Sequence, residues 1–133
     1  MPAGAAALLA EARALLPRAQ APYSRFRVAA VLEDAAGTRH PGVNVESATL
    51  GLSICAERNA LFGAVARGHA PMIRIAIVSE TLRPVLPCGA CRQVLFEYAP
   101  GLLVVLERAH GSPEEVTLRD LLPRPFSDFE PAP

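Results

Sequence analysis

Three cysteines and one glutamate are the side chains of this sequence whose types and spacing could do chemistry. Cys55 and Glu57 are separated by one residue, and Cys88 and Cys91 are separated by two residues directly after a proline. Three thiolates can hold a zinc ion and leave its fourth tetrahedral position open for water, unlike a closed structural site. A carboxylate next to that water can transfer protons. The spacing therefore predicts a zinc hydrolase in which Glu57 transfers protons.

Arg58 directly follows Glu57 and is placed to tune the charge of the predicted metal site. Three thiolates around a divalent cation leave one net negative charge, so a positive charge nearby should matter. The alternative is that Arg58 is an ordinary solvated arginine. The cysteines could likewise pack as small buried apolar residues, and Glu57 could simply stabilise the start of a helix. A zinc-stabilised binding module, in which Glu57 is incidental, is the non-enzymatic alternative.

A closed structural zinc site would need a fourth protein ligand. The chain has three histidines, and none of them stands at the spacing that zinc fingers use. We expect all three, His40, His69 and His110, to lie on the surface. An odd number of cysteines with a close pair favours metal binding in a reducing compartment over a disulfide framework. We therefore expect a cytoplasmic protein.

The composition narrows the class of protein. A length of 133 residues predicts a single catalytic domain over residues 1–133. The 13 basic and 13 acidic residues leave no net charge, which disfavours binding to a nucleic acid polymer. The absence of lysine excludes Schiff-base chemistry. No stretch reaches the ~18 apolar residues of a membrane span, and the N-terminal segment predicts a helix rather than a secretion signal.

The elements that must position these residues follow from the hydrophobic pattern and its interruptions. Helices are predicted over residues 3–16, 55–67, 88–98 and 116–122. Strands are predicted over residues 26–32, 40–46, 73–78 and 102–106. Prolines exclude a helix over residues 123–129. This alternation places helices on both faces of a sheet.

Two of the predicted helices begin at the cysteines. A pair of cysteines at i and i+3 in a first helical turn directs both sulfurs the same way, which suits Cys88 and Cys91. Cys55 opens the other helix, with Ser53 available as its capping residue. Thiolates are favoured at helix N-termini because the helix dipole and the free N–H groups lower their pKa. The pattern therefore places all three sulfurs where a cation could bind them.

The two sequence motifs that contain the cysteines resemble those of a known enzyme family. CAERNA at residues 55–60 and PCGACRQ at residues 87–93 are similar to the three-cysteine form of the zinc deaminases. More narrowly, they resemble the small homotetrameric cytidine deaminases, and the likeness continues through residues 21–26, 44–46 and 121–123. It covers nearly the whole chain. The resemblance implies an α/β protein with three α/β/α layers around a central mixed five-stranded sheet.

The resemblance also implies an activity. Cys55, Cys88 and Cys91 would bind one Zn²⁺ per chain, and Glu57 would act as the proton shuttle. The reaction would be the hydrolytic deamination of cytidine and 2′-deoxycytidine to uridine and 2′-deoxyuridine, with release of ammonia, in pyrimidine salvage. A related aminopyrimidine nucleoside is the second candidate substrate. A deaminase that edits polynucleotides is disfavoured by the neutral charge.

The substrate site is implied by further matches to the family. Asn44 and Glu46 match its sugar-binding pair, and residues two apart on a strand share a face. Phe26 matches an aromatic that packs near the nucleoside, and Phe126 matches one that reaches a neighbouring subunit's site. Ala56 is assigned to the same substrate site. The alternatives are a polar strand edge for the pair and plain core packing for each phenylalanine.

One residue departs from the family pattern. Leu50 stands where the family often has an aromatic residue, commonly tyrosine. The difference leaves the zinc chemistry untouched, but it concerns the packing around the sugar and a subunit contact. The preference between ribose and deoxyribose stays open at this point.

Overall fold

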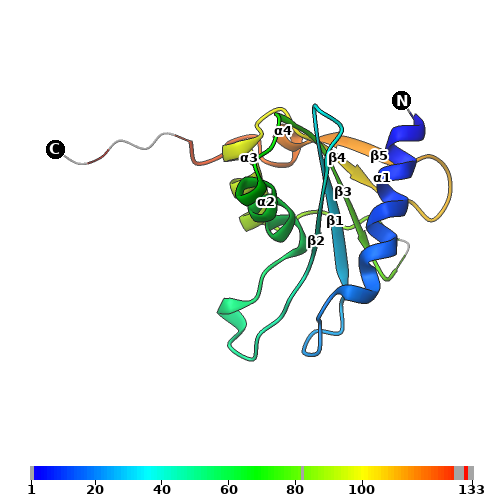
Figure 1. Cartoon of the computed structure of the whole chain (residues 1–133), viewed down its shortest axis with the longest axis vertical. Coiled ribbons are helices and arrows are strands. Elements are labelled where there is room, and N and C mark those ends of the chain that lie inside the picture. Colours follow the sequence, from blue (N-terminus) through cyan, green and yellow to red (C-terminus); the bar gives the residue numbers. More distant parts are fainter. Residues whose placement is uncertain (1, 82, 128–130, 132–133) are drawn as a thin grey trace.

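The computed structural model describes residues 2–81, 83–127 and 131, which form a mixed five-stranded sheet with helices on both faces (Figure 1). The sheet has the order β2-β1-β3-β4-β5. Its strands are β1 (Val28–Asp34), β2 (Arg39–Val43), β3 (Met72–Ser79), β4 (Leu103–Leu106) and β5 (Glu114–Thr117). The α-helices are α1 (Pro2–Leu15), α2 (Ala56–Arg67), α3 (Gly89–Tyr98) and α4 (Leu118–Leu121). Two short 3₁₀ turns are η1 (Leu16–Arg18) and η2 (Leu50–Leu52).

Two hydrophobic clusters occupy the two faces of this sheet. α1 covers one face, and α2 and α3 cover the other (Figure 1). Along β1, Ala30 and Leu32 belong to the cluster under α2 and α3, whereas Ala29 and Val31 belong to the cluster under α1. Successive side chains of a strand point to opposite faces, which explains why every residue of β1 is buried. The predicted three-layer α/β/α architecture is confirmed.

Strand directions bring the starts of α2 and α3 together. β1 pairs antiparallel with both β2 and β3, so β2 and β3 run in the same direction on either side of it. The chain leaves β2, forms a hairpin in which Val45 pairs with Ile54, and then enters α2. It leaves β3 and enters α3 before returning as β4, parallel to β3. Both helices therefore begin at the edge where β2 and β3 end.

A close backbone approach fixes α2 against β2. A Cβ atom on Gly42 would meet the carbonyl oxygen of Ala56 and would lie 2.5 Å from the backbone nitrogen of Ala60. Only glycine fits this position. At the other end of α2, Gly68 adopts a φ of 83° and ends the helix, as predicted. The first turn of α2 is thus held directly on the sheet.

One strand was not predicted, and several predicted elements are shifted, among them the first strand, which spans Val28–Asp34 rather than residues 26–32. The predicted helix over residues 116–122 is a strand followed by a single helical turn, because Val116 pairs with Val104 and completes the edge of the sheet. The second predicted strand ends at Val43 rather than at residue 46. The tail is non-helical from residue 123 to residue 127 as predicted, and residues 128 and 129 lie outside the described residues.

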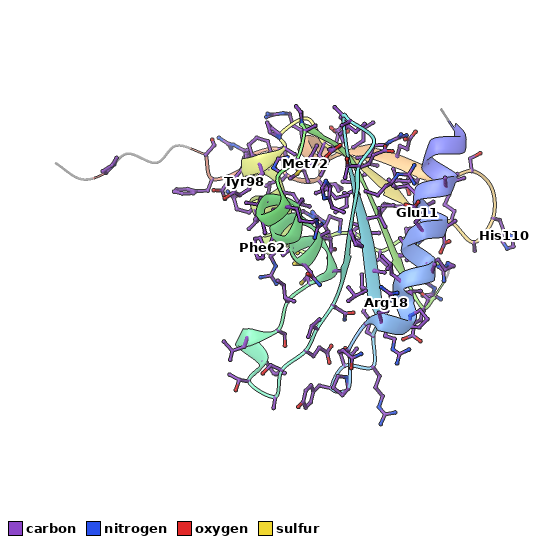
Figure 2. All side chains as sticks on the ribbon, viewed as in Figure 1. Glu11, Arg18, Phe62, Met72, Tyr98 and His110 are labelled. Carbon is purple, nitrogen blue, oxygen red and sulfur yellow. The ribbon has the colours of Figure 1, made fainter. Side chains whose placement is uncertain are left out.

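His40 is buried, which corrects the prediction that all three histidines lie on the surface. Its Nε2 lies 3.0 Å from Asp34 Oδ2, and its Nδ1 lies 3.2 Å from an amino group of Arg67 at the end of α2. The hydrogen bond from His40, with those from backbone amides, lowers the pKa of Asp34. A polar residue on β2 is covered here because α2 packs over it. His69 and His110 are exposed, and His110 lies on the loop between β4 and β5 (Figure 2).

Candidate metal centre and active site

The three cysteine sulfurs meet at the edge where α2 and α3 begin. Sγ atoms of Cys55, Cys88 and Cys91 all lie within 4.8 Å of one another, and Cys55 Sγ is 3.9 Å from Cys88 Sγ. Zn–S bonds of about 2.3 Å place tetrahedral ligands ~3.8 Å apart, so the sulfurs are spaced for one zinc ion. Among the described residues, no other group of histidine, cysteine, aspartate or glutamate side chains gathers in this way.

The three cysteines lie at the N-terminal ends of α2 and α3. Cys55 and Cys88 are the N-cap residues of α2 and α3, with extended backbone conformations. Each helix therefore begins one residue later than predicted, and the predicted cap Ser53 instead accepts a hydrogen bond from Ser47 N at 3.0 Å. Cys91 lies in the first turn of α3 and donates its backbone N–H to Cys88 Sγ at 3.5 Å. Both helix dipoles point their positive ends at the sulfur cluster.

Burial shapes the acid–base properties of the cluster. Glu57 is only 4% exposed, and burial raises the pKa of its carboxyl group. The pKa of the Cys91 thiol is also raised, mainly by burial and to a smaller extent by the negative charge of Glu57. A cation bound by the sulfurs would favour the thiolate forms. Three sulfurs beside a buried carboxyl group therefore fit a zinc ion rather than a set of packed apolar cysteines.

Arg58 lies against the sulfurs as the sequence analysis expected. One of its amino groups donates to Cys55 Sγ at 3.2 Å, and contacts with Cys55 and Cys91 raise the pKa of the guanidinium. Its Nε is buried without a hydrogen-bond partner among the described residues. A fixed positive charge beside the sulfurs would offset part of the charge of three thiolates. The charge-tuning role of Arg58 stays a prediction.

A cavity of about 240 Å³, which we call the active-site cavity, opens next to the cluster. It brings together most of the residues that the sequence analysis singled out, with some that it did not. It is lined by Ser24, Phe26, Val28, Asn44, Glu46, Cys55, Ala56, Glu57, Val85, Leu86 and Cys88. The sequence did not indicate the contributions of Ser24, Val28, Val85 and Leu86. Ser24 lies within the family-like segment 21–26, whereas the segment before Cys88 offered no signal.

Asn44 and Glu46 line this cavity and also shape its wall. Asn44 Oδ1 accepts a hydrogen bond from Val28 N at 2.9 Å, and its Nδ2 donates to the Phe26 carbonyl oxygen at 2.8 Å. Glu46 accepts hydrogen bonds from the Ser24 backbone N–H at 3.0 Å and from the Ser24 hydroxyl group. These hydrogen bonds lower the pKa of Glu46, and the largest effect comes from the Ser24 hydroxyl group. The pair therefore orders the segment that carries Phe26.

Phe126 does not line the active-site cavity of its own chain. Its side chain is 66% exposed and borders a separate hollow beside Phe96 and Pro100. Gln93 holds its backbone, donating to the Phe126 carbonyl oxygen at 2.7 Å and accepting from its N–H at 3.0 Å. Leu50 is also exposed, at 70%, and lies on the hairpin that leads into α2. The structure thus leaves both residues on the surface.

Comparison with known proteins identifies the family to which this chain belongs. The family model described as the cytidine and deoxycytidylate deaminase zinc-binding region matches residues 4–107. The chain belongs to this deaminase family. The match contains the phrases that carry all three sulfurs and Glu57, so the predicted resemblance and the zinc cofactor are confirmed.

Individual deaminases are similar over nearly the whole chain. A cytidine deaminase of Halalkalibacterium halodurans is 45% identical over 121 residues, which cover 90% of this chain and 92% of that protein. The crystal structure of cytidine deaminase from Burkholderia pseudomallei is 47% identical, with a TM-score of 0.84, and covers 91% of this chain and 98% of that one. The crystal structure of cytidine deaminase from Mycobacterium tuberculosis is 34% identical, with a TM-score of 0.79, and the match covers 92% of this chain and 96% of that one. Among the described residues of this family member, no helix is long and apolar enough to cross a membrane.

Proposed function

We propose that the protein is a cytidine deaminase with one catalytic domain over residues 1–133. It converts cytidine and 2′-deoxycytidine, with water, into uridine and 2′-deoxyuridine, and releases ammonia in pyrimidine salvage. The observation that carries this proposal is the convergence of three cysteine sulfurs and a buried glutamate on one cavity. The identity of the chain as a member of the deaminase family supports the reaction type.

The metal ion would be held by the three thiolates. We assign Cys55, Cys88 and Cys91 as ligands of one zinc ion, with Arg58 offsetting their negative charge. When bound in such a site, zinc makes an activated water available at neutral pH. Cys55 and Cys88 are the N-cap residues of helices that pack on the sheet, which limits the movement of two of the three ligands. A fixed ligand set suits catalysis because the reacting groups do not need to be reorganised.

Glu57 would carry the protons of the reaction. Its carboxylate accepts a proton from the attacking water and passes it to N3 of the pyrimidine ring, which makes C4 more electrophilic. The remaining hydroxide adds to C4. Glu57 then moves the proton of the new C4 hydroxyl group onto the amino group, which leaves as ammonia as the C4 carbonyl group forms. Burial raises the pKa of Glu57 above its ordinary value, which makes the carboxylate a better proton acceptor. Removal of Glu57 should therefore affect turnover far more than zinc binding.

The walls of the active-site cavity suit a nucleoside. We assign Asn44 and Glu46 to the sugar hydroxyl groups, and Phe26 and Ala56 to the surface that packs against the nucleoside. An ionised carboxylate only accepts hydrogen bonds, so Glu46 favours a ligand that presents hydroxyl groups. Its negative charge disfavours a ligand that carries a phosphate. Within a family that includes deoxycytidylate deaminases, this charge supports a nucleoside substrate over a nucleotide.

The exposed apolar side chains support assembly with further copies of the chain. Leu50 and Leu52 are 70% and 75% exposed, and Phe62 and Val65 lie exposed on α2. Phe62 points away from the sheet on the outer side of α2 (Figure 2). Phe62 and Val65 stand three residues apart on α2 and therefore share one face of the helix, which favours a partner that covers this face. We propose a homotetramer in the cytoplasm, in which Phe126 reaches the active-site cavity of a neighbouring subunit.

A direct assay tests the proposed activity. Purified protein of known zinc content is mixed with cytidine, and conversion to uridine is followed by ultraviolet absorbance. Deoxycytidylate and a cytosine-nucleoside analogue are run in parallel. We expect turnover of cytidine, and about 10²–10⁴-fold slower turnover in a zinc-loaded Glu57→Gln variant. Zinc-loaded wild-type protein that leaves cytidine unchanged would refute the substrate, and a Glu57→Gln variant at the wild-type rate would refute the proton shuttle.

A further inference from the structure

Arg92 joins two backbone segments beside the metal centre. Its Nε donates a hydrogen bond to the Pro87 carbonyl oxygen at 2.7 Å, and its Nη1 donates to the Leu121 carbonyl oxygen at 2.9 Å. Pro87 is buried and immediately precedes Cys88, one of the three sulfur residues. The planar guanidinium group presents several donors in a fixed fork, which allows one side chain to hold two carbonyl groups at once. Arg92 thus connects the entry to α3 with the end of α4.

The backbone that leads into Cys88 has little support of its own. Residues 84–88 lie outside every helix and strand, and Pro84 and Pro87 have no N–H group to donate. Within the part of the chain that the structure describes, the Pro87 carbonyl is the only polar group of residues 83–87 that makes a hydrogen bond. Cys88 is also the most exposed of the three cysteines. Apart from the packing of Val85 on the core, the Arg92 contact is therefore what ties this segment to its surroundings among the described residues.

The other end of the connection is firmly anchored. Leu118, the first residue of α4, is fully buried, and its N–H donates to the Leu102 carbonyl oxygen at 2.9 Å. Thr117 caps the helix by accepting a hydrogen bond from the Asp120 N–H at 3.1 Å. The Leu121 carbonyl that Arg92 holds thus belongs to a segment fixed by the core and by its own cap. Arg92 transfers this rigidity to the segment before Cys88.

We propose that Arg92 is a positioning residue for the metal centre, which keeps Cys88 Sγ within reach of the sulfurs of Cys55 and Cys91. This inference rests on the zinc site of the proposed function. Without Arg92, the buried Pro87 carbonyl would lose its partner and the segment could move away from the cluster. Groups that orient metal ligands typically contribute about 10–100-fold to metal affinity. We expect an effect of that size on the zinc affinity.

The test compares zinc binding by Arg92 variants and a matched control. Arg92→Met removes both hydrogen bonds, and Arg92→Lys keeps the charge but cannot form the same fork. The control is Arg119→Met. Arg119 lies 5.0 Å from the centre of the Phe96 ring, so it also joins α3 to α4, but it is not bonded to the segment before Cys88. Zinc affinity is measured by competition with a chromophoric chelator, and stability by thermal denaturation of the same samples.

We expect both Arg92 variants to bind zinc about 10–100-fold more weakly than wild type, with the control unchanged even where its melting temperature falls. If Arg92→Met does not fold, Arg92→Lys decides the question. Wild-type affinity in a folded Arg92 variant would overturn the inference and leave the deaminase proposal intact. Equal zinc loss in Arg119→Met would also overturn it, because affinity would then follow general stability. A wild-type protein that binds no zinc would overturn both proposals.

Discussion

Replacing Gly42 with alanine should force α2 away from β2 and disturb the metal centre through the backbone alone. The new Cβ atom would lie 2.5 Å from the Ala60 nitrogen and closer still to the Ala56 carbonyl oxygen, where an ordinary contact begins at 3.4 Å, so the helix must retreat by at least about 0.9 Å. Backbone atoms cannot rotate aside as a side chain can. Over-packing of this kind typically costs 1–3 kcal/mol, and we expect about 3 kcal/mol here. For a chain of this length, that loss lowers the melting temperature by about 10 °C.

The same displacement reaches the chemistry because the first turn of α2 carries Glu57 and its N-cap is Cys55. A misplacement of about 1 Å can cost roughly 100-fold in rate. We therefore expect Gly42→Ala to lose about two orders of magnitude in turnover of cytidine while it still folds at 25 °C. Melting is followed by circular dichroism, and zinc content and turnover are measured on the same preparation.

Gly101→Ala is the matched control, because a Cβ atom at Gly101 would meet nothing within 4 Å. It should melt within a few degrees of the wild type and keep its turnover. A Gly42→Ala protein that behaves like this control would show that α2 tolerates the added methyl group. The reasoning that ties the position of the catalytic residues to the β2 backbone would then be wrong.

Three further predictions follow from individual contacts. Cys88→Ser should weaken zinc binding and lower the melting temperature, because metal binding and folding are coupled; metal analysis that finds full occupancy and unchanged melting would contradict the ligand assignment. The pKa of Asp34 is lowered in the folded protein, so its ionised carboxylate stabilises the fold above the ordinary pKa of about 4, and this contribution is lost as the pH falls through the pKa of the folded state. Urea unfolding of wild type and Asp34→Asn between pH 7 and pH 3 should therefore show that the free energy of unfolding depends less on pH in the variant. Ser24→Ala should raise the KM for cytidine by about fivefold with little change in kcat, because Glu46 loses one hydrogen bond that orients it; steady-state kinetics with equal KM values would exclude this role.

The local sequence predicted most of the elements, because their patterns are set by neighbours along the chain. Apolar runs marked β1, β3 and β4, and glycine marked the end of α2. Two of the differences between prediction and structure have a common cause. Val116 and its neighbours form a strand only because β4 offers an unpaired edge, and His40 is buried only because α2 lies over β2. Propensity is overridden in both places by contacts between distant segments.

The sequence by itself determined which groups do the chemistry: three cysteines, the glutamate beside one of them, and the phrases that mark the family. Only the tertiary structure decided that these groups meet. Cys55 and Cys88 are 33 residues apart in the chain, yet their sulfurs lie 3.9 Å apart. The reason is that β2 and β3 share β1 as an antiparallel neighbour, so both strands end at one edge and both helices begin there. Strand order and the hydrogen bond from Arg92 to the Leu121 carbonyl oxygen arise from contacts between distant segments, which no local spacing encodes.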